Sequence, residues 1–225
     1  MKNSLSVGII MDGNRRWAKA HNVSAAEGHK KGSDALIDLL RAYPELKESH
    51  NITDYIFYAF STENWNRSEE EVGALMNLLK TGLSRIEEEL EKLEEAPRIR
   101  FIGDLSRFEE SLQKEMKDIE MRTKDGEGVV ALALSYGGRD EIVRAAQKAE
   151  TISEEGISEN LDTHDIKDPD IIIRTGGEKR LSNFLLWQAA YSEFFFIDIF
   201  WPEFTRDTLI SCITEYNERE RRHGV

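Results

Sequence analysis

An alternation of short apolar runs with longer amphipathic stretches is the feature that most constrains the fold of this chain. The runs are rich in branched and aromatic residues, and most are continuously apolar, which is typical of strands covered on both faces. They are Val7–Met11, Tyr55–Phe60, Ile99–Ile102, Val129–Leu134, Ile171–Ile173 and Phe194–Phe200. Helical patterns lie between them at 25–42, 69–95, 105–123, 139–153 and 205–222. This order predicts an α/β fold: one domain over residues 1–225 with a mostly parallel six-stranded sheet and helices on both faces.

The acidity of the chain argues against general nucleic-acid binding. Its 225 residues include 30 Lys and Arg against 43 Asp and Glu, a net charge of −13, whereas a nucleic-acid surface must be basic. Cys212 is the single cysteine, so we expect neither an intrachain disulfide nor a cysteine-ligated zinc. No apolar run is long enough for the core of a signal peptide or for a membrane span. We therefore expect a soluble, cytoplasmic protein.

Polar and glycine-containing segments follow four of the expected strands. They are Asp12 to Asn14, Ser61 to Arg67, Ser135 to Arg139 and Arg174 to Glu178. Ligands of open parallel sheets bind beyond the carboxyl ends of the strands, so we expect these segments to converge on one site. Arginines with glycine-flanked amides suit a phosphorylated ligand. A carboxylate among them indicates a divalent cation, and oxygen ligation favours Mg²⁺.

Asp12 and the residues after it also have a purely structural interpretation. An Asp that follows a strand commonly caps the next helix, and Arg15 and Arg16 would then lie at a solvated helix start. Cations are disfavoured at the N-terminus of a helix, however, so two arginines there favour a binding role. His29, taken alone, is more typical of a polar surface histidine.

The segment after the second strand has two interpretations as well. Its hydroxyl groups are typical of a turn, and Ser68 with Glu71 is typical of a capping box for the following helix. Trp65 has no such role in a polar loop and predicts a mobile flap over a ligand.

Four stretches of the chain together resemble the signature regions of the cis-prenyltransferase family. They are MDGNRRWAK, YAFSTENWNR, SYGGR and IIIRTGGEKRLSNFLLWQAAYSEFFFIDIFWPEF, and the resemblance extends from about Val7 to Gly224. It implies a homodimer with a parallel-sheet α/β fold. The implied activity is the Mg²⁺-dependent, cis addition of isopentenyl diphosphate to farnesyl diphosphate. The implied product is a long-chain polyprenyl (undecaprenyl) diphosphate, a lipid carrier precursor for cell-wall synthesis that is delivered to the membrane.

The resemblance implies roles for residues that follow the first strand. Asp12 matches the essential aspartate of the family, a magnesium ligand that assists departure of the allylic diphosphate. The cradle of that diphosphate comprises Gly13, Asn14, Arg15, Arg16 and Trp17, with His29 beside it.

Residues after position 60 match the family's substrate-joining loop, its isopentenyl diphosphate site and its contact with the neighbouring subunit. The flexible loop that joins the two substrates comprises Ser61, Thr62, Glu63, Trp65 and Arg67. The isopentenyl diphosphate clamp comprises Arg174, Arg180, Leu181 and Ser182. The remaining matches are a second magnesium-associated carboxylate, Glu193, and two residues that reach into the neighbouring subunit's site, Arg222 and Gly224.

Asn64 matches the position that the family assigns as proton acceptor. Because a neutral amide is a very poor base, a relay or positioning role is chemically easier, with a diphosphate oxygen as the final acceptor.

Two positions depart from the family pattern. Many relatives have Gly where this chain has Arg15, and a phosphate-binding Arg where it has Ala25. We hypothesise that Arg15 supplies by another route the charge that is missing at position 25.

The expected helix at 69–95 carries apolar residues at helical spacing from Val72 to Leu93. Most such faces only pack against a core. A growing hydrocarbon tail must be hidden from water, so this face and the strands opposite are the best candidates for a tunnel wall.

Two other functions are disfavoured by the residues present. A phosphatase with an aspartyl nucleophile would need a second Asp two residues after Asp12, where this chain has Asn14. A non-catalytic subunit on the same fold would lack the catalytic aspartate and the clamp arginines, and this chain keeps both.

Overall fold

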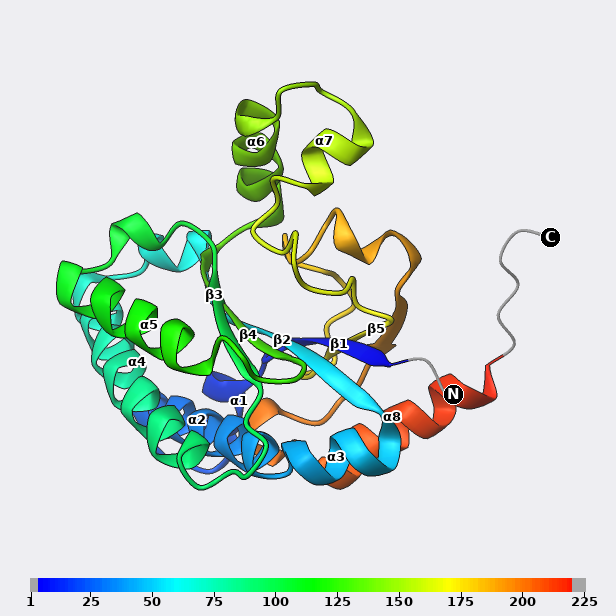
Figure 1. Cartoon of the computed structure of the whole chain (residues 1–225). Helices are drawn as coiled ribbons and strands as arrows, with labels where there is room; N and C mark the ends of the chain where they lie inside the picture. Colours follow the sequence, from blue (N-terminus) through cyan, green and yellow to red (C-terminus); the bar gives the residue numbers. More distant parts are fainter. Residues whose placement is uncertain (1–3, 220–225) are drawn as a thin grey trace.

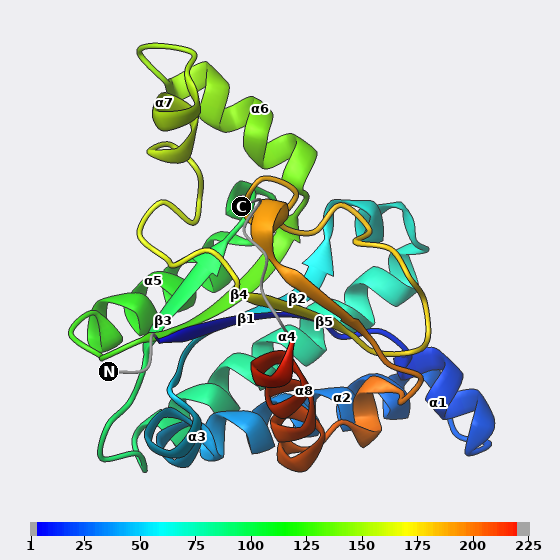
Figure 2. The same cartoon turned by 90° about the vertical axis from the view of Figure 1, so that its right-hand side faces the viewer.

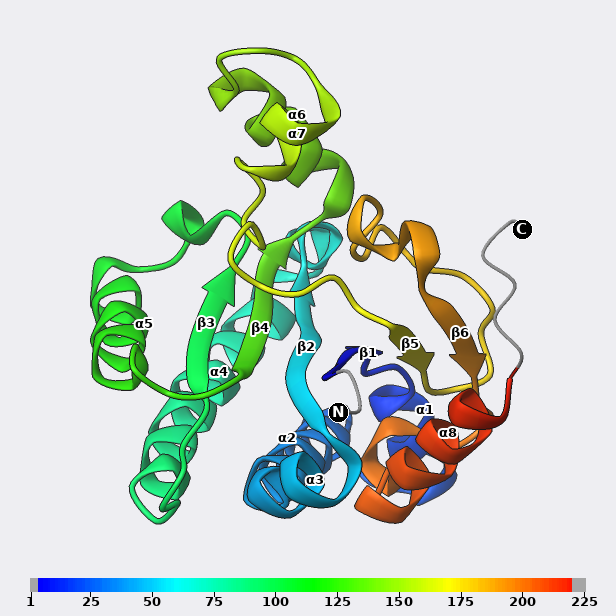
Figure 3. The same ribbon diagram turned by 45° about the vertical axis from the view of Figure 1, so that its right-hand side comes forward.

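The computed structural model describes residues 4–219 and contains a six-stranded sheet in which every pairing is parallel. Its order is β3-β4-β2-β1-β5-β6, which can be followed in Figure 3, a view turned by 45° from that of Figure 1. The strands are β1 (Leu5–Ile10), β2 (Ile52–Ser61), β3 (Arg98–Ile102), β4 (Val129–Tyr136), β5 (Ile171–Arg174) and β6 (Glu193–Phe196). The predicted α/β class and parallel sheet are confirmed.

The last strand ends earlier than its apolar run suggested. After Phe196 the chain bends over the loop that follows β5, where Gly176 and Gly177 donate backbone hydrogen bonds of 2.8 Å to Ile199 and Ile197. Residues 197–200 therefore pair with a loop instead of continuing the ladder.

Eight α-helices are present within the described residues. They are α1 (Asn14–Ala20), α2 (Ala25–Arg41), α3 (Tyr43–His50), α4 (Glu69–Leu90), α5 (Glu110–Thr123), α6 (Gly138–Lys148), α7 (Glu154–Ser158) and α8 (Arg206–Glu218). The five predicted helical regions are confirmed with shorter ends. The unpredicted helices α1, α3 and α7 span only five to eight residues, too few for an apolar period to be recognised. None of the helices described is long and apolar enough to cross a membrane.

The two faces of the sheet are covered differently. Figure 2 shows α2, α3 and α8 on one side and α6 with α7 on the other. Val7 and Ile9 of β1 face the larger apolar cluster, which includes residues of α2, α4 and α8. Ile10 faces the smaller cluster, whose cover includes Phe184 and Leu185 from the segment after β5. Helices therefore lie on both sides, while much of the second face is covered by irregular chain.

Two glycines let α1 lie directly on α2. A Cβ atom at Gly28 would collide with the backbone of Asn14, and one at Gly32 would collide with the Asn14 side chain and the Trp201 ring. The indole Nε1 of Trp201 donates a 2.7 Å hydrogen bond to the Gly32 carbonyl. This close approach fixes α1 and its two arginines beside the end of β1.

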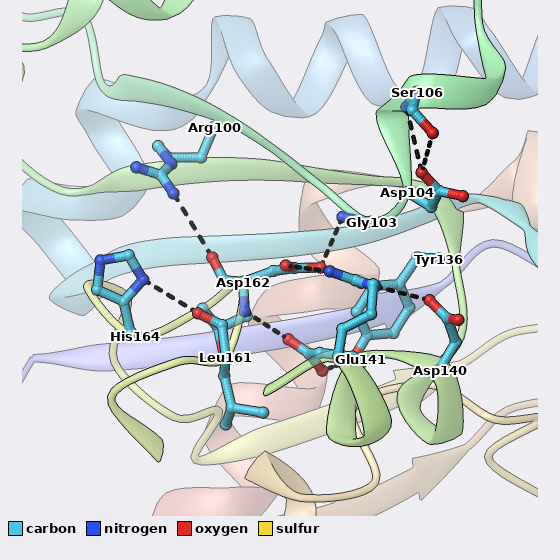
Figure 4. A network of polar contacts seen from close by, with 12 residues as sticks. Arg100, Gly103, Asp104, Ser106, Tyr136, Asp140, Glu141, Leu161, Asp162 and His164 are labelled. Carbon is cyan, nitrogen blue, oxygen red and sulfur yellow. Dashed lines mark hydrogen bonds and ion pairs between the residues drawn. The ribbon is translucent and has the colours of Figure 1, made fainter. Parts of the chain in front are cut away.

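A polar network holds the segment after α7 against β3 and α6 (Figure 4). The Asp162 carboxylate accepts hydrogen bonds from Arg144 at 2.6 and 2.7 Å and from the Gly103 N–H at 3.0 Å. The Glu141 carboxylate accepts a 3.1 Å hydrogen bond from the Asp162 N–H and a second one from the Tyr136 hydroxyl. Burial raises the pKa of Glu141, which is 1% exposed. These contacts fix the turn between β4 and α6.

A bidentate ion pair joins α2 to α4. The Arg41 guanidinium donates to Glu89 through Nε at 2.8 Å and Nη2 at 2.9 Å, and Lys92 adds a bond of 2.8 Å. The Glu89 side chain is 9% exposed. The hydrogen bonds from Arg41 and Lys92 lower the pKa of Glu89 to about 2.

Glu89→Gln should lower the free energy of unfolding by roughly 1.5–3 kcal/mol at neutral pH, because hydrogen bonds to charged groups are weakened. The folded pKa of about 2 lies below the ordinary value of 4.5. The stabilisation is therefore present above pH 4.5 and is lost as the pH falls from there toward 2. Urea unfolding over a pH series should show that the difference in the free energy of unfolding between wild type and Glu89→Gln shrinks with acidification.

Glu88→Gln is the matched control, because Glu88 is the exposed neighbour of Glu89. A difference that does not vary with pH would contradict this account.

Candidate active site

A cavity of about 470 Å³ lies at the carboxyl ends of β1 and β2, between the sheet and helices α2 and α4. The predicted site residues that line it are Asp12, Gly13, Asn14, Arg15, Arg16, His29, Ser61, Asn64 and Arg67. Much of the rest of the lining is apolar and comes from the two helices: Leu36, Ile37, Leu75, Leu78, Leu79, Leu83 and Ile86. The apolar face expected between 72 and 93 thus forms one wall of this cavity.

The carboxylate of Asp12 is held between two arginines. Its Oδ2 accepts a 2.8 Å hydrogen bond from Arg174 Nη2, and its Oδ1 is 3.0 Å from Arg16 Nη2. Burial acts to raise the pKa of Asp12, but the hydrogen bonds from Arg174 and Arg16 outweigh it and hold the pKa below its ordinary value. Helix α1 begins after Gly13 without a side-chain cap. Asp12 is therefore an ionised site residue and not a helix cap.

Arg174 ends β5 and is the most enclosed charge of the site, with 5% of its side chain exposed. Its Nη1 donates to Ser182 Oγ at 2.8 Å and to the carbonyl oxygen of Arg180. Its Nε is buried without a hydrogen-bond partner among residues 4–219. The Arg180 guanidinium pairs with Glu178. The structure thus brings Arg174 together with Ser182 and with the backbone of Arg180.

Arg16 links α1 to the loop after β5. Its Nη1 donates a 2.6 Å hydrogen bond to the carbonyl oxygen of Gly176 and lies 3.8 Å from Glu178 Oε1. Its guanidinium also lies over the Phe200 ring, 5.6 Å from the centroid. Gly176 has a φ of +82°, and a Cβ there would be 2.5 Å from Arg16. Glycine is needed at this position because the backbone approaches the arginine so closely.

The loop after β2 forms a short 3₁₀ helix, η1 (Thr62–Asn66), with reciprocal caps. The Ser61 N–H donates to Asn64 Oδ1 at 2.9 Å, and the Ser61 side chain accepts from the Asn64 backbone. At the next helix, the Glu71 N–H donates to Ser68 Oγ at 3.3 Å, as the capping pattern predicted. Asn64 lines the cavity with its side-chain oxygen already engaged, which favours a positioning role.

The flap interpretation of Trp65 is corrected by its packing. The ring lies 4.9 Å from Phe60 and 5.4 Å from Phe108 between centroids. Its Nε1 donates a 3.0 Å hydrogen bond to Ser135 Oγ, and Trp65 does not line the cavity. Because a large aromatic surface is more stable when it is buried, the ring anchors the loop to the core instead of covering a ligand.

Two further predicted residues lie apart from the cavity. Trp17 stacks on His21, with ring centroids 4.2 Å apart. Glu193 begins β6, level with the start of β5, and its Oε2 is 2.8 Å from Arg219 Nη1. Asp12 instead follows the carboxyl end of β1. A parallel sheet separates these two ends, so one chain does not bring Asp12 and Glu193 together.

The remaining predicted residues lie around the clamp or beyond the structure. Thr62 Oγ1 donates to Glu63 Oε2 at 3.1 Å. Leu181 is partly buried against the smaller apolar cluster. The predictions for Arg222 and Gly224 fall outside the described residues, 4–219.

A second groove of about 950 Å³ adjoins the cavity along α2 and α4, and His29 lines both. Burial lowers the pKa of His29, and the positive charges of Arg67 and Arg15 lower it further. His29 is therefore neutral at neutral pH. Arg15 and Ala25 line the same groove. They are therefore close enough for Arg15 to supply the positive charge that is missing at position 25.

Asn183 is a site-forming residue that the sequence did not reveal. Its side chain bonds to Glu63 and to the backbone of Arg139, so it connects two of the four strand-end segments. Its position just before an apolar run that begins at Phe184 gives no local signal of these contacts, which arise from the tertiary fold.

An ionised carboxylate between arginines, beside an apolar lining, suits a diphosphate that carries a hydrocarbon chain. Residues 10–224 match the family described as "Putative undecaprenyl diphosphate synthase", and the chain belongs to this prenyltransferase family.

Relatives and solved structures agree with the family assignment. The chain is 44% identical to a ditrans,polycis-undecaprenyl-diphosphate synthase of Vibrio vulnificus, described as (2E,6E)-farnesyl-diphosphate specific, over 97% of this chain and 89% of the relative. It is 44% identical to an isoprenyl transferase of Rhizobium meliloti, over 97% and 91%. The crystal structure of lavandulyl diphosphate synthase from Lavandula x intermedia with dimethylallyl diphosphate matches with a TM-score of 0.89 and 34% identity over 98% of both chains. A probable undecaprenyl diphosphate synthase from Campylobacter jejuni matches with a TM-score of 0.80 and 36% identity over 100% of both.

The anion-binding character of the site can be tested without any catalytic assay. With divalent cations removed, inorganic pyrophosphate should bind Asp12→Asn more tightly than wild type, because a negative charge beside Arg16 and Arg174 is removed. Arg16→Ala should weaken the same binding by roughly 1.5–3 kcal/mol, or about ten- to a hundredfold. Isothermal titration calorimetry measures both. Equal affinities in all three proteins would show that pyrophosphate does not bind at this carboxylate.

Proposed function

We propose that this protein elongates farnesyl diphosphate by sequential cis addition of isopentenyl diphosphate, to give a long-chain polyprenyl (undecaprenyl) diphosphate. The observation that carries the proposal is the Asp12–Arg16–Arg174 cluster at one end of an apolar cavity. The cluster suits the diphosphate, and the leucine-lined walls suit the tail. Farnesyl-diphosphate-specific relatives at 44% identity support this choice of substrate.

The apolar walls would favour binding of a growing hydrocarbon chain. Each CH₂ group removed from water contributes about 0.8 kcal/mol. The lining from Leu75 to Ile86 along α4, with Leu132 and Leu134 of β4 opposite, can provide this burial over several turns of helix. Binding energy therefore grows with the tail.

In each cycle a bond forms between the allylic carbon that carries the diphosphate and the terminal alkene carbon of isopentenyl diphosphate. Pyrophosphate leaves with the bonding pair of the C–O bond, and a proton is lost to form the new double bond. Arg16 would stabilise the negative charge that develops on the leaving group, because it is already oriented by the fold. Arg174 would hold the diphosphate of isopentenyl diphosphate in the clamp. Asn64 would orient the reacting groups, and a diphosphate oxygen would accept the proton.

A magnesium ion fits the residues present. Within residues 4–219, no group of three or more His, Cys, Asp or Glu side chains forms a metal site. Mg²⁺ is, however, commonly bound by one or two carboxylates together with substrate phosphates, and the ionised Asp12 on the cavity wall is such a donor. A bound Mg²⁺ would neutralise charge on the leaving diphosphate.

The family resemblance extends the proposal to assembly and location. It implies a homodimer in which Arg222 and Gly224 act in the partner's site, and in which Glu193 assists a metal. A product of this length is insoluble in water, so we also propose a cytoplasmic enzyme that acts peripherally at the membrane and delivers its product there.

The proposal is tested by incubating the purified protein with labelled isopentenyl diphosphate, farnesyl diphosphate and Mg²⁺ and sizing the products. A ladder that ends in a long-chain polyprenyl diphosphate is expected. A short product made from dimethylallyl diphosphate alone would instead indicate an activity closer to that of the lavandulyl neighbour. Release of phosphate from simple phosphomonoesters would favour a phosphatase.

Gly82→Leu should shorten the product. Gly82 lines the cavity on α4, and a Cβ there would have only Ser33 Oγ nearby, at 3.9 Å, so the larger side chain has room to enter the lumen. Gly73→Leu is a matched control on the same helix, because a Cβ at Gly73 meets nothing within 4 Å and lies outside the cavity. Both changes improve helix propensity by about 1 kcal/mol. Chromatographic sizing should show shorter chains from Gly82→Leu alone, and identical ladders from both variants would refute this placement of the tail.

A further inference from the structure

Asn183 makes three hydrogen bonds to two segments that are remote in sequence. Its carbonyl oxygen accepts from the Gly138 N–H at 2.6 Å, and its Oδ1 accepts from the Arg139 N–H at 2.9 Å. Its Nδ2 donates to Glu63 Oε1 at 3.1 Å. One residue therefore joins the turn after β4 and the loop after β2 to the segment that follows β5.

The adjacent residue connects Asn183 to the clamp. Ser182 Oγ accepts a 2.8 Å hydrogen bond from Arg174, and the Ser182 carbonyl oxygen accepts one of 3.2 Å from the Tyr58 hydroxyl. A shift of Asn183 must therefore move a group that orients Arg174.

The glycine pair after β4 makes room for Asn183. A Cβ at Gly137 would lie 2.7 Å from Asn183 Nδ2 and 2.8 Å from Thr62 Oγ1, and one at Gly138 would lie 3.2 Å from the Asn183 carbonyl oxygen. The N–H groups of Gly138 and Arg139 are both donated to Asn183. The pair therefore serves close packing and is not an amide cradle for phosphate.

The backbone at this junction is held in an uncommon conformation. Ser182, Asn183 and Leu185 have φ values of 49°, 66° and 44°. Left-handed conformations cost energy for residues other than glycine, although Asn tolerates them best. Such conformations persist where surrounding contacts determine them, and they concentrate at functional sites.

We propose that Asn183 is a positioning residue that couples the loop 61–67 to the Arg174–Ser182 clamp, so that the two substrate subsites keep their relative geometry. It does not line the cavity, and it acts through Glu63, Ser182 and the β4–α6 turn. The inference rests on the proposed function only for the identity of the substrates.

Asn183→Asp is the first test. The new carboxylate tolerates the same φ and can still accept from the Arg139 N–H, but it faces Glu63 without a donor. The KM for isopentenyl diphosphate should rise about tenfold or more, since a hydrogen bond to a charged group is replaced by repulsion. The KM for farnesyl diphosphate and the thermal midpoint should change little. Asn22→Asp is a matched control, because Asn22 is exposed and has a φ of 57°.

Glu63→Gln supplies the rescue. Alone, it still offers an amide oxygen to Asn183 Nδ2, and its KM is the reference for the double variant. Combined with Asn183→Asp, it restores a donor opposite the new carboxylate, and the KM should return to within a few fold of that of Glu63→Gln. A double variant as impaired as Asn183→Asp would overturn the proposal. A uniform loss of thermal stability without a change in KM would overturn it too, and would reduce Asn183 to a structural residue.

A readout independent of activity separates this proposal from the proposed function. In Asn183→Gly, which permits positive φ but removes both side-chain bonds, amide hydrogen exchange should accelerate in segments 61–67 and 136–139. Asn22→Gly should leave those segments unchanged. If wild type failed to elongate, the proposed function would fall while faster exchange still supported the coupling. Unchanged exchange in 61–67 would overturn the coupling, whatever the activity.

Discussion

The nearly buried guanidinium of Arg174 sets the arrangement of the whole carboxyl edge of the sheet. A charge removed from water is costly unless it is paired and hydrogen-bonded, and Arg174 is 4% exposed. Asp12 supplies the opposite charge from the end of β1, which pairs directly with β5 through Ile10 and Arg174. The Ser182 hydroxyl and the Arg180 carbonyl oxygen both accept from Arg174 Nη1. The loop after β5 must therefore fold back over its own strand, and the groups proposed to hold both diphosphates gather at one place.

Glycines near this edge of the sheet have no Cβ atom, and this allows neighbouring groups to approach the backbone closely. Gly176 allows the backbone to reach Arg16, while Gly137 leaves space for Asn183 and Thr62. Of the two glycines, only Gly176 contacts a residue of the Asp12–Arg16–Arg174 cluster. A Gly-Gly pair after a strand is thus ambiguous in sequence, since it indicates close approach but not what approaches. In this protein the pair Gly176-Gly177 borders the proposed diphosphate site. The pair Gly137-Gly138 allows the turn after β4 to pack closely against Asn183 and the loop after β2.

Much of the fold could be predicted from periodicity, because buried parallel strands and long amphipathic helices leave patterns that survive in the sequence. The convergence of Asp12 and Arg174 also followed from topology, since parallel strands end at one edge. The position of Trp65 could not be predicted in this way, because Phe60 and Phe108 reach its ring only through tertiary packing. Glu193 was placed by resemblance alone, and its register at the start of β6 separates it from Asp12 within one chain.

The cavity itself demands a physical explanation, because apolar side chains that face a void lose the contacts that a closed core would give them. Collapse of α4 onto the sheet is opposed at one end of the helix by the Arg41–Glu89 pair, which fixes its distance from α2. Near the other end, Arg15 lies 3.4 Å from Glu71. Between these contacts the facing surfaces carry Ser33, with a small side chain, and Gly82, with none, which leaves the lumen open. Polar contacts at the ends of the helix thus maintain a space whose apolar lining gains its missing contacts only when a hydrocarbon chain enters.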